Sequence, residues 1–286
     1  MTTVVLALVS ALFYGLSDFV GGIASRRTSA WAVAVVGNAA SAVGATVLAL
    51  VAAGSPTTTD LAWGLFAGIG GGMGTGFLYR GFATGRMSVV APVSAVGAAV
   101  IPVLAGVVSG ERPSLVVWAG IAVALPGIWL VSSSPEHPAT EMGPAAGRSG
   151  LPEGLVDAIL AGIGFGLLFA ALGQVPARAG LWPVVASQAV SVPAVIVLAL
   201  VVGGSWVPRG KPVRLGVLTG LLGVGATATF LLSTQHGFLT VAAVLASLYP
   251  ATTVLLAWLV LREHIHRSQA VGLALCALAI VLVAGG

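Results

Sequence analysis

Charged residues are scarce in this chain of 286 residues. Only 7% of them are Asp, Glu, Lys or Arg, and 58% are hydrophobic. A soluble domain carries about 25% charged residues because its surface faces water. The few charges here are enough only for the loops of a protein whose outer surface faces lipid. The composition therefore excludes a soluble domain and predicts a membrane protein.

Clustered basic residues and paired cysteines are also absent. The 12 Lys and Arg residues, which with 8 acidic residues leave a net charge of +4, stand singly or in pairs between apolar runs. No basic stripe with interleaved aromatic residues is present, so the sequence argues against nucleic-acid binding. The single cysteine, Cys276, cannot form an intrachain disulfide and is expected to pack as a small apolar side chain.

Sequence motifs for catalysis or for a bound cofactor are missing as well. There is no HExxH and no paired aspartate cluster of the kind that holds Mg²⁺-pyrophosphate. The nearest approach to a phosphate-binding loop, residues 204–212, has the wrong spacing. His264 and His266 form a short pair without further ligands. We therefore predict no metal, no cofactor and no enzyme, and we expect any transport to be driven by a gradient.

Long apolar runs dominate what remains. A helix needs about 20 apolar residues to cross roughly 30 Å of hydrocarbon, and ten runs qualify. The first has no basic residue ahead of Arg26, so we interpret it as a transmembrane helix and not as a signal peptide. We predict an all-α polytopic membrane protein with ten transmembrane helices at 3–23, 31–53, 61–80, 88–109, 114–132, 154–174, 181–202, 213–235, 239–261 and 268–285.

The chain repeats itself when it is shifted by 152 residues, and by 151 in the first helices. Glycine and glutamate identities support the match, because many alanine and valine matches are expected by chance in a sequence so rich in these two residues. We predict a first five-helix repeat at 1–132, a flexible Pro-, Gly- and Ser-rich linker at 133–151 and a second five-helix repeat at 152–286. Aligned pairs are Gly64/Gly216, Gly68/Gly220, Gly71/Gly223, Thr75/Thr227, Gly85/Gly237, Glu111/Glu263, Gly120/Gly272, Gly15/Gly166, Arg27/Arg178 and Trp31/Trp182.

An odd number of crossings in each repeat predicts that the second lies upside down relative to the first. Inverted repeats recur in secondary transporters, whose substrate site lies near the membrane midplane between the halves. This is an analogy of construction and not a proof of transport.

Three local features, each present twice, support a resemblance to a known family. They are an aromatic-Gly pair in the first helix of each half, a proline-containing fourth helix, and a Glu at its end with a Gly nine residues on. The chain resembles the EamA-type ten-helix branch of the drug/metabolite transporter superfamily. The resemblance implies a basket of ten helices around a central cavity that transports metabolites, amino acids or drugs. The residues are Tyr14-Gly15, Phe165-Gly166, Pro92, Pro102, Pro250, Glu111, Gly120, Glu263 and Gly272.

Glycines recur every four residues in the third helix and are echoed in the eighth. This spacing gives a smooth ridge that lets another backbone approach closely. The ridge serves either static packing or a contact along which one half rocks against the other. The predicted helix-packing residues are Gly64, Gly68, Gly72, Gly76, Gly216 and Gly220.

Asp18 is the clearest ionisable residue inside an apolar run. An uncompensated carboxylate there costs several kcal/mol, so Asp18 is either a protonatable or substrate-contacting group or the partner of Arg26, Arg27 or another loop arginine. His236 ends the eighth helix in a polar cluster, and histidine titrates near neutrality. A structural place at the interface is the alternative for His236.

Other polar and aromatic residues in the apolar runs complete the predicted site. Asn38 and Gln188 either join helices or line a cavity, and Tyr14, Phe165, Tyr249 and Trp258 either line a pocket or face lipid. For Glu111 we expect an ion pair with a neighbouring arginine, because a carboxylate opposes the dipole at a helix C-terminus. The substrate or coupling candidates are Asp18, Tyr14, Asn38, Gln188, His236 and Tyr249.

The distribution of basic residues predicts the orientation. Ten Lys and Arg residues lie in odd-numbered loops and two in even-numbered ones, which places both termini outside by the positive-inside rule. The family resemblance implies cytoplasmic termini instead. We expect a multi-pass protein of a bacterial plasma or inner membrane, a monomer or homodimer, whose partners are the bilayer and a small-molecule substrate.

The sequence thus predicts a secondary transporter of a small organic metabolite or drug, proton-coupled and with efflux favoured over uptake. A membrane-embedded enzyme and a non-transporting sensor or assembly protein are the alternatives. The first needs a catalytic cluster, and the second should lack a solvent-accessible central cavity.

Overall fold

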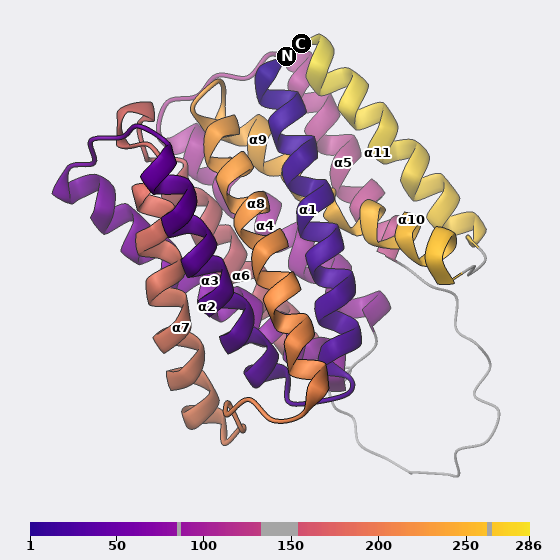
Figure 1. Ribbon diagram of the computed structural model, residues 1–286. Helices are drawn as coiled ribbons and strands as arrows, with labels where there is room; N and C mark the ends of the chain where they lie inside the picture. The colour runs from indigo at the N-terminus through magenta and orange to yellow at the C-terminus, as the bar shows by residue number, and fades with distance from the viewer. Residues whose placement is uncertain (85–86, 133–153, 262–264) are drawn as a thin grey trace.

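The computed structural model describes residues 1–84, 87–132, 154–261 and 265–286 (Figure 1). The predicted linker at 133–151 and Glu263 lie outside these ranges. The described part consists of helices and their connections: α1 (Thr2–Ser25), α2 (Ala30–Val51), α3 (Thr58–Thr84), α4 (Met87–Val108), α5 (Leu115–Ser132), α6 (Leu155–Leu172), η1 (Ala177–Ala179), α7 (Trp182–Val202), η2 (Lys211–Arg214), α8 (Leu215–Thr234), α9 (Leu239–Ala246), α10 (Tyr249–Leu261) and α11 (Arg267–Gly285).

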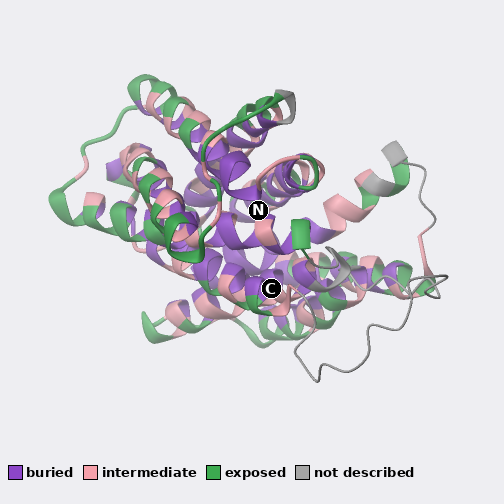
Figure 2. Cartoon of the chain, turned by 90° about the horizontal axis from the view of Figure 1, so that it is seen from below, coloured by how far each residue is buried: buried purple, intermediate pink, exposed green. Residues whose placement is uncertain are grey.

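These helices confirm the ten predicted membrane crossings. Within the described ranges, nine segments are long and apolar enough to span a bilayer, and Leu115–Val131 is a shorter tenth. Both termini lie at the same end of the bundle, as an even number of crossings requires (Figure 1). Large apolar side chains such as Val51, Val108 and Leu200 are exposed on the outside, and Figure 2 shows the buried residues gathered in the interior. An apolar exterior is the right surface for lipid.

Short polar or glycine-containing segments end the helices. The Ser29 hydroxyl accepts a hydrogen bond from the Ala32 amide at the start of α2, as N-cap residues do. Gly203 ends α7 with a φ of 79°, a backbone conformation that glycine adopts without steric cost. The breakers between the apolar runs therefore act where the sequence indicates.

The ninth crossing corrects one prediction. We expected one helix over 239–261, but the structure has two, with Ser247 and Leu248 between them. Pro250 explains the break, because it lacks an amide proton and its ring clashes with the carbonyl four residues earlier. That residue is Ala246, where α9 ends. Pro92 and Pro102, in contrast, lie inside a continuous α4.

The two halves pack through matching pairs of helices. Helix α3 of the first half packs against α6 and α7 of the second half. Helix α8 of the second half packs against α1 and α2 of the first half. In the same way α4 packs against α6, while α9 and α10 pack against α1. Exchanging each helix with its repeat partner turns one set of contacts into the other.

The predicted glycine ridges lie in these contacts. A Cβ on Gly64 or Gly68 of α3 would collide with backbone atoms of Pro183 or Ser187 in α7, and one on Gly72 would lie 2.8 Å from the Ala194 Cβ. Gly76 instead faces the Trp31 ring of α2.

The ridge of α8 faces α2. A Cβ on Gly216 would lie 3.0 Å from the Val33 carbonyl oxygen, and one on Gly220 would collide with the carbonyl of Gly37. Backbones in both contacts therefore approach more closely than any other side chain would allow.

Glu111 corrects a second prediction. Its carboxylate does not pair with a described arginine; its two oxygens accept hydrogen bonds from the backbone amides of Leu239 and Thr240, the second at 2.9 Å. These are the first amides of α9, which have no partner within their own helix. A carboxylate that opposes the dipole of α4 thus complements the dipole of α9 in the other half.

Two ion pairs also join the halves. The Arg178 guanidinium lies 3.1 Å from the Asp60 carboxylate, and the Arg80 guanidinium lies 3.3 Å from that of Asp157. Asp60 and Arg80 stand at opposite ends of α3. The halves are therefore tied together by charged groups at both ends of the bundle.

Candidate solute-binding cavity

A cavity lies between the two halves. Its walls come from α1, α2 and α3 of the first half and from α6, α7 and α8 of the second. The space open to the centre of a water molecule is about 50 Å³, room for on the order of four waters. The lining residues are Tyr14, Ser17, Asp18, Gly37, Asn38, Ser41, Gly71, Thr75, Tyr79, Phe165, Leu168, Ser187, Gln188, Ser191, Thr219, Gly220, Gly223 and Thr227.

The close helix contacts create this space. Glycines at 37, 71, 220 and 223 line it. A Cβ on Gly71 or Gly223 would lie against lining side chains, whereas one on Gly37 or Gly220 would collide with the facing helix. Two pairs from the 152-residue repeat, Gly71/Gly223 and Thr75/Thr227, lie in its walls. Equivalent helices of the two halves therefore face one another across the cavity.

Asp18 is the acidic residue of the cavity. Only 7% of its surface is exposed, and no described basic side chain forms an ion pair with it. The alternative in which Arg26 or Arg27 neutralises Asp18 therefore finds no support, and the Arg26 guanidinium instead donates to the Phe82 carbonyl at 3.4 Å. A buried carboxyl group in a membrane protein that has no cationic partner can exchange a proton or another cation.

All three tyrosines of the chain lie at the cavity that holds Asp18 or next to it. The Tyr14 hydroxyl lies 3.1 Å from the Thr227 hydroxyl on α8, and the Tyr249 hydroxyl lies 3.2 Å from that of Ser94 on α4. Tyr14 and Tyr79 line the cavity, whereas Tyr249 lies behind Tyr14 with 6.3 Å between the ring centroids. The phenol groups thus link elements from both halves.

Several polar side chains in the walls have no hydrogen-bond partner. The Asn38 amide nitrogen on α2 and the hydroxyls of Ser41 and Ser187 are buried and unbonded within the described structure. Buried polar groups are nearly always paired, with protein or with water. Gln188 is bonded, since its amide donates to the Thr227 hydroxyl at 3.4 Å. All three residues are among those that line the cavity.

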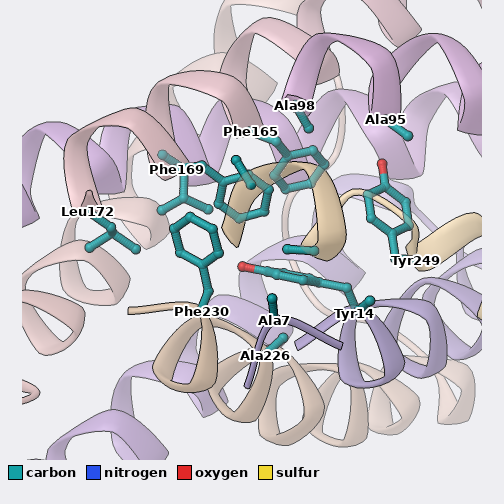
Figure 3. Packing of buried hydrophobic residues seen from close by; sticks show 14 of the residues in the cluster. Ala7, Tyr14, Ala95, Ala98, Phe165, Phe169, Leu172, Ala226, Phe230 and Tyr249 are labelled. Carbon is teal, nitrogen blue, oxygen red and sulfur yellow. The ribbon is translucent and has the colours of Figure 1, made fainter. Parts of the chain in front are cut away.

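An aromatic cluster borders the cavity on the side of the second half. Phe169 stacks on Phe230 with 4.3 Å between centroids and meets Tyr14 edge-on at 5.6 Å. Figure 3 shows these three rings and Phe165 turned toward one another. The packing leaves the polar wall of α1 facing an apolar wall of α6.

Most of the predicted candidates come together here, but not all. Asp18, Tyr14, Asn38 and Gln188 line the cavity, and Tyr249 adjoins it. His236 lies apart from these residues, exposed beyond the end of α8, where its Nδ1 lies 2.7 Å from the Leu232 carbonyl oxygen. Trp258 is 51% exposed on the outside, and Phe165 lines the cavity.

Sequence reasoning missed part of the lining. Tyr79 was not predicted, nor were Ser17, Ser191 and Thr219. One signal was present for Tyr79, since it continues a stripe of every fourth residue in α3 that includes Thr75 and Gly71. Residues four apart lie on one helix face. Within the described ranges, no three His, Cys, Asp or Glu side chains form a group that could hold a metal ion.

Comparisons with known proteins agree with this architecture. A solved crystal structure of a protein covers 98% of this chain and 95% of its own length with a TM-score of 0.71, at 16% sequence identity. That identity supports the fold alone. A search of curated proteins found no match. The sequence model of the EamA-like transporter family matches residues 1–133 and 153–285, which confirms the resemblance seen in the sequence. The chain is a multi-pass membrane protein and belongs to the EamA-like transporter family.

Proposed function

We propose that this protein is a secondary transporter that moves a small organic solute across the plasma or inner membrane of a bacterium in exchange for protons, in the direction of export. The family supports membrane transport. The observation that best supports a coupled mechanism is the Asp18 carboxyl group, which faces a cavity between the halves without a described basic partner.

Asp18 would couple the flux of protons to the flux of the solute by binding only one of them at a time. With a proton bound, the carboxyl is neutral and the cavity carries no net charge. Without it, the negative charge costs several kcal/mol in a low-dielectric surrounding unless a solute offsets it. A proton and a solute that compete for one group exchange with each other, which is the requirement for antiport.

The arrangement of the halves suggests how access alternates. We propose that the two repeats are inverted and rock against each other along the α3–α7 and α8–α2 contacts. Opening one end would separate Asp60 from Arg178 and Glu111 from α9, while opening the other would separate Arg80 from Asp157. With all of these contacts formed, the structure corresponds to a closed state around the cavity.

One chain suffices for this mechanism, because both walls of the cavity come from the same chain. We therefore propose the monomer as the functional unit. The loops that carry most of the basic residues would face the cytoplasm, with both termini outside.

Flux in proteoliposomes with an imposed pH gradient tests the proposal. Vesicles that contain the purified protein are loaded with a mixture of labelled metabolites, and we expect efflux of at least one solute with proton entry. In Asp18→Asn the pH-driven flux should fall to the level of empty vesicles. Glu141→Gln, a carboxyl-to-amide change in the predicted linker, is the control and should retain flux. Undiminished pH-driven flux in Asp18→Asn excludes coupling through Asp18, and the absence of any flux from the unmodified protein excludes transport.

A further inference from the structure

We infer that the cavity takes a small organic monocation, a protonated amine that also carries a neutral hydrogen-bonding group. This inference rests on the proposed transport function and adds the chemical class of the solute. Its first support is the charge of the walls. Asp18 is acidic, and no Lys, Arg or His is among the lining residues that the structure describes. A carboxylate or phosphate on the solute would meet a negative group and no positive one, whereas an ammonium group would meet a charge of opposite sign.

The aromatic residues around Asp18 favour the same class. Tyr14, Tyr79 and Phe165 line the cavity together with Asp18. The face of an aromatic ring attracts a cation within about 6 Å of its centroid. Rings beside a carboxylate can thus hold the carbon groups of an amine while the carboxylate holds its charge.

The unpaired groups on α2 and α7 define the other end of the solute. Asn38, Ser41 and Ser187 each have a buried polar atom without a described partner. They are uncharged, so they match a carbonyl, an amide or a hydroxyl. A solute that has only an amine and hydrocarbon would leave all three unbonded, at about 1–3 kcal/mol for each buried group.

The size of the cavity excludes large drugs from this conformation. Its volume of about 50 Å³ for water centres corresponds to on the order of four waters. A molecule with a few non-hydrogen atoms is the appropriate size. Gly71 and Gly223 contribute to this space, because a Cβ on either would meet only side chains of other lining residues, at 3.1 Å or more.

Electroneutral exchange follows from this choice of solute. One proton enters on Asp18 as one monocation leaves it, so no net charge crosses the membrane. The flux should therefore respond to a pH gradient but not to a membrane potential imposed with potassium and valinomycin. A neutral solute exchanged for one proton would move charge and respond to both.

A set of probes of nearly equal size and different charge tests the inference. Glycinamide is a cation at neutral pH, glycolamide replaces its ammonium by a hydroxyl, glycine is a zwitterion and glycolate is an anion. We expect calorimetry on the purified protein to show glycinamide binding about 10- to 100-fold more tightly than the other three, the range for a hydrogen bond to a charged group. A pH indicator should show up to one proton released for each cation bound.

Variants separate charge recognition from folding. Asp18→Asn should bind glycinamide and glycolamide equally and release no proton, while Glu141→Gln, in the predicted linker, should keep the preference. Equal binding of all four probes, tightest binding of glycolate, or no binding of glycinamide overturns the inference. pH-driven flux of an anionic or neutral solute would overturn it too, but would leave the proposed transport function intact.

Discussion

The first helices of the two halves, α1 and α6, both line the cavity but have different chemistry. Tyr14, Ser17 and Asp18 of α1 align, at the 151-residue shift, with Phe165, Leu168 and Phe169 of α6. Hydroxyl and carboxyl groups thus stand in one copy where hydrocarbon stands in the other. Of the aligned positions, only the one in α1 carries an acidic side chain. In the proposed mechanism one carboxylate serves as one exchange site, whereas two carboxylates in a cavity of this size would repel each other.

The largest effect is expected when the apolar wall is made acidic. Phe169 is 1% exposed and packed against two rings, so Phe169→Asp buries an unpaired charge and removes the stacking. We expect a loss of roughly 3–5 kcal/mol in stability, enough to abolish the folded protein in detergent. Fluorescence-detected size-exclusion chromatography measures this. Phe169→Leu, the control, should remain folded. An Asp variant as monodisperse as the Leu variant would mean that the two walls are interchangeable.

The second effect concerns the two glycine ridges, which should be equally destabilised by substitution of glycine with alanine. Gly68→Ala and Gly220→Ala each push a methyl group into a backbone carbonyl of the opposite half, at a cost of roughly 1–3 kcal/mol. Gly223→Ala is the control, because its Cβ would lie 3.7 Å from the Ser41 hydroxyl, an ordinary contact. Thermal unfolding should show lower midpoints for the first two only. A lower midpoint for one ridge alone would make the halves mechanically unequal.

The third effect tests the link from α4 to α9. Glu111→Ala leaves the Leu239 and Thr240 amides unbonded and should cost about 1–2 kcal/mol, as other lost helix caps do. Glu111→Gln keeps one acceptor and should cost less. Midpoints of thermal unfolding in detergent give both values. If the two variants were equally unstable, the charge of Glu111 would matter more than its acceptor oxygens.

The smallest effect is expected when α1 is made more like α6. Tyr14→Phe places on α1 the side chain that α6 has at the aligned position and removes the contact with Thr227. Thr227 still donates to the Gly223 carbonyl at 2.9 Å, so the loss should be about 1 kcal/mol. Thermal unfolding tests stability, and glycinamide binding tests the site. A stability loss above about 3 kcal/mol would contradict a merely local role for this hydroxyl.

Sequence reasoning located the helices well because hydrocarbon thickness sets their length and the linking segments carry breakers. It also selected Asp18, Tyr14, Asn38 and Gln188, which all line the cavity. Polar groups inside apolar runs cost free energy in a membrane, so their presence indicates a structural or functional role. Sequence reasoning missed Tyr79, whose aromatic ring suits lipid and cavity equally well. His236 was predicted for the site but lies outside it. A polar cluster at a helix end is equally typical of an exposed turn, so the sequence could not distinguish the two.

Long-range contacts were beyond the reach of local patterns. The role of Glu111 was predicted from its own helix and from nearby arginines, but its partners lie 128 and 129 residues away. Pro250 breaks its helix while Pro92 and Pro102 do not, a difference that depends on how neighbouring helices replace the lost hydrogen bonds. The prolines of the two fourth helices and the aligned glutamates marked positions of interest without indicating what they contact.

The distance along the chain between Glu111 and α9 has a consequence for synthesis. At about 5–20 residues per second, roughly 6–25 s pass between the appearance of Glu111 and that of the amides it caps. In the same way, Arg178, the partner of Asp60, is synthesised 118 residues after it. During that interval the newly made first half holds carboxylates whose partners do not yet exist, at the edge of the bilayer. The first five helices can enter the membrane on their own, but their final packing has to wait for the rest of the chain.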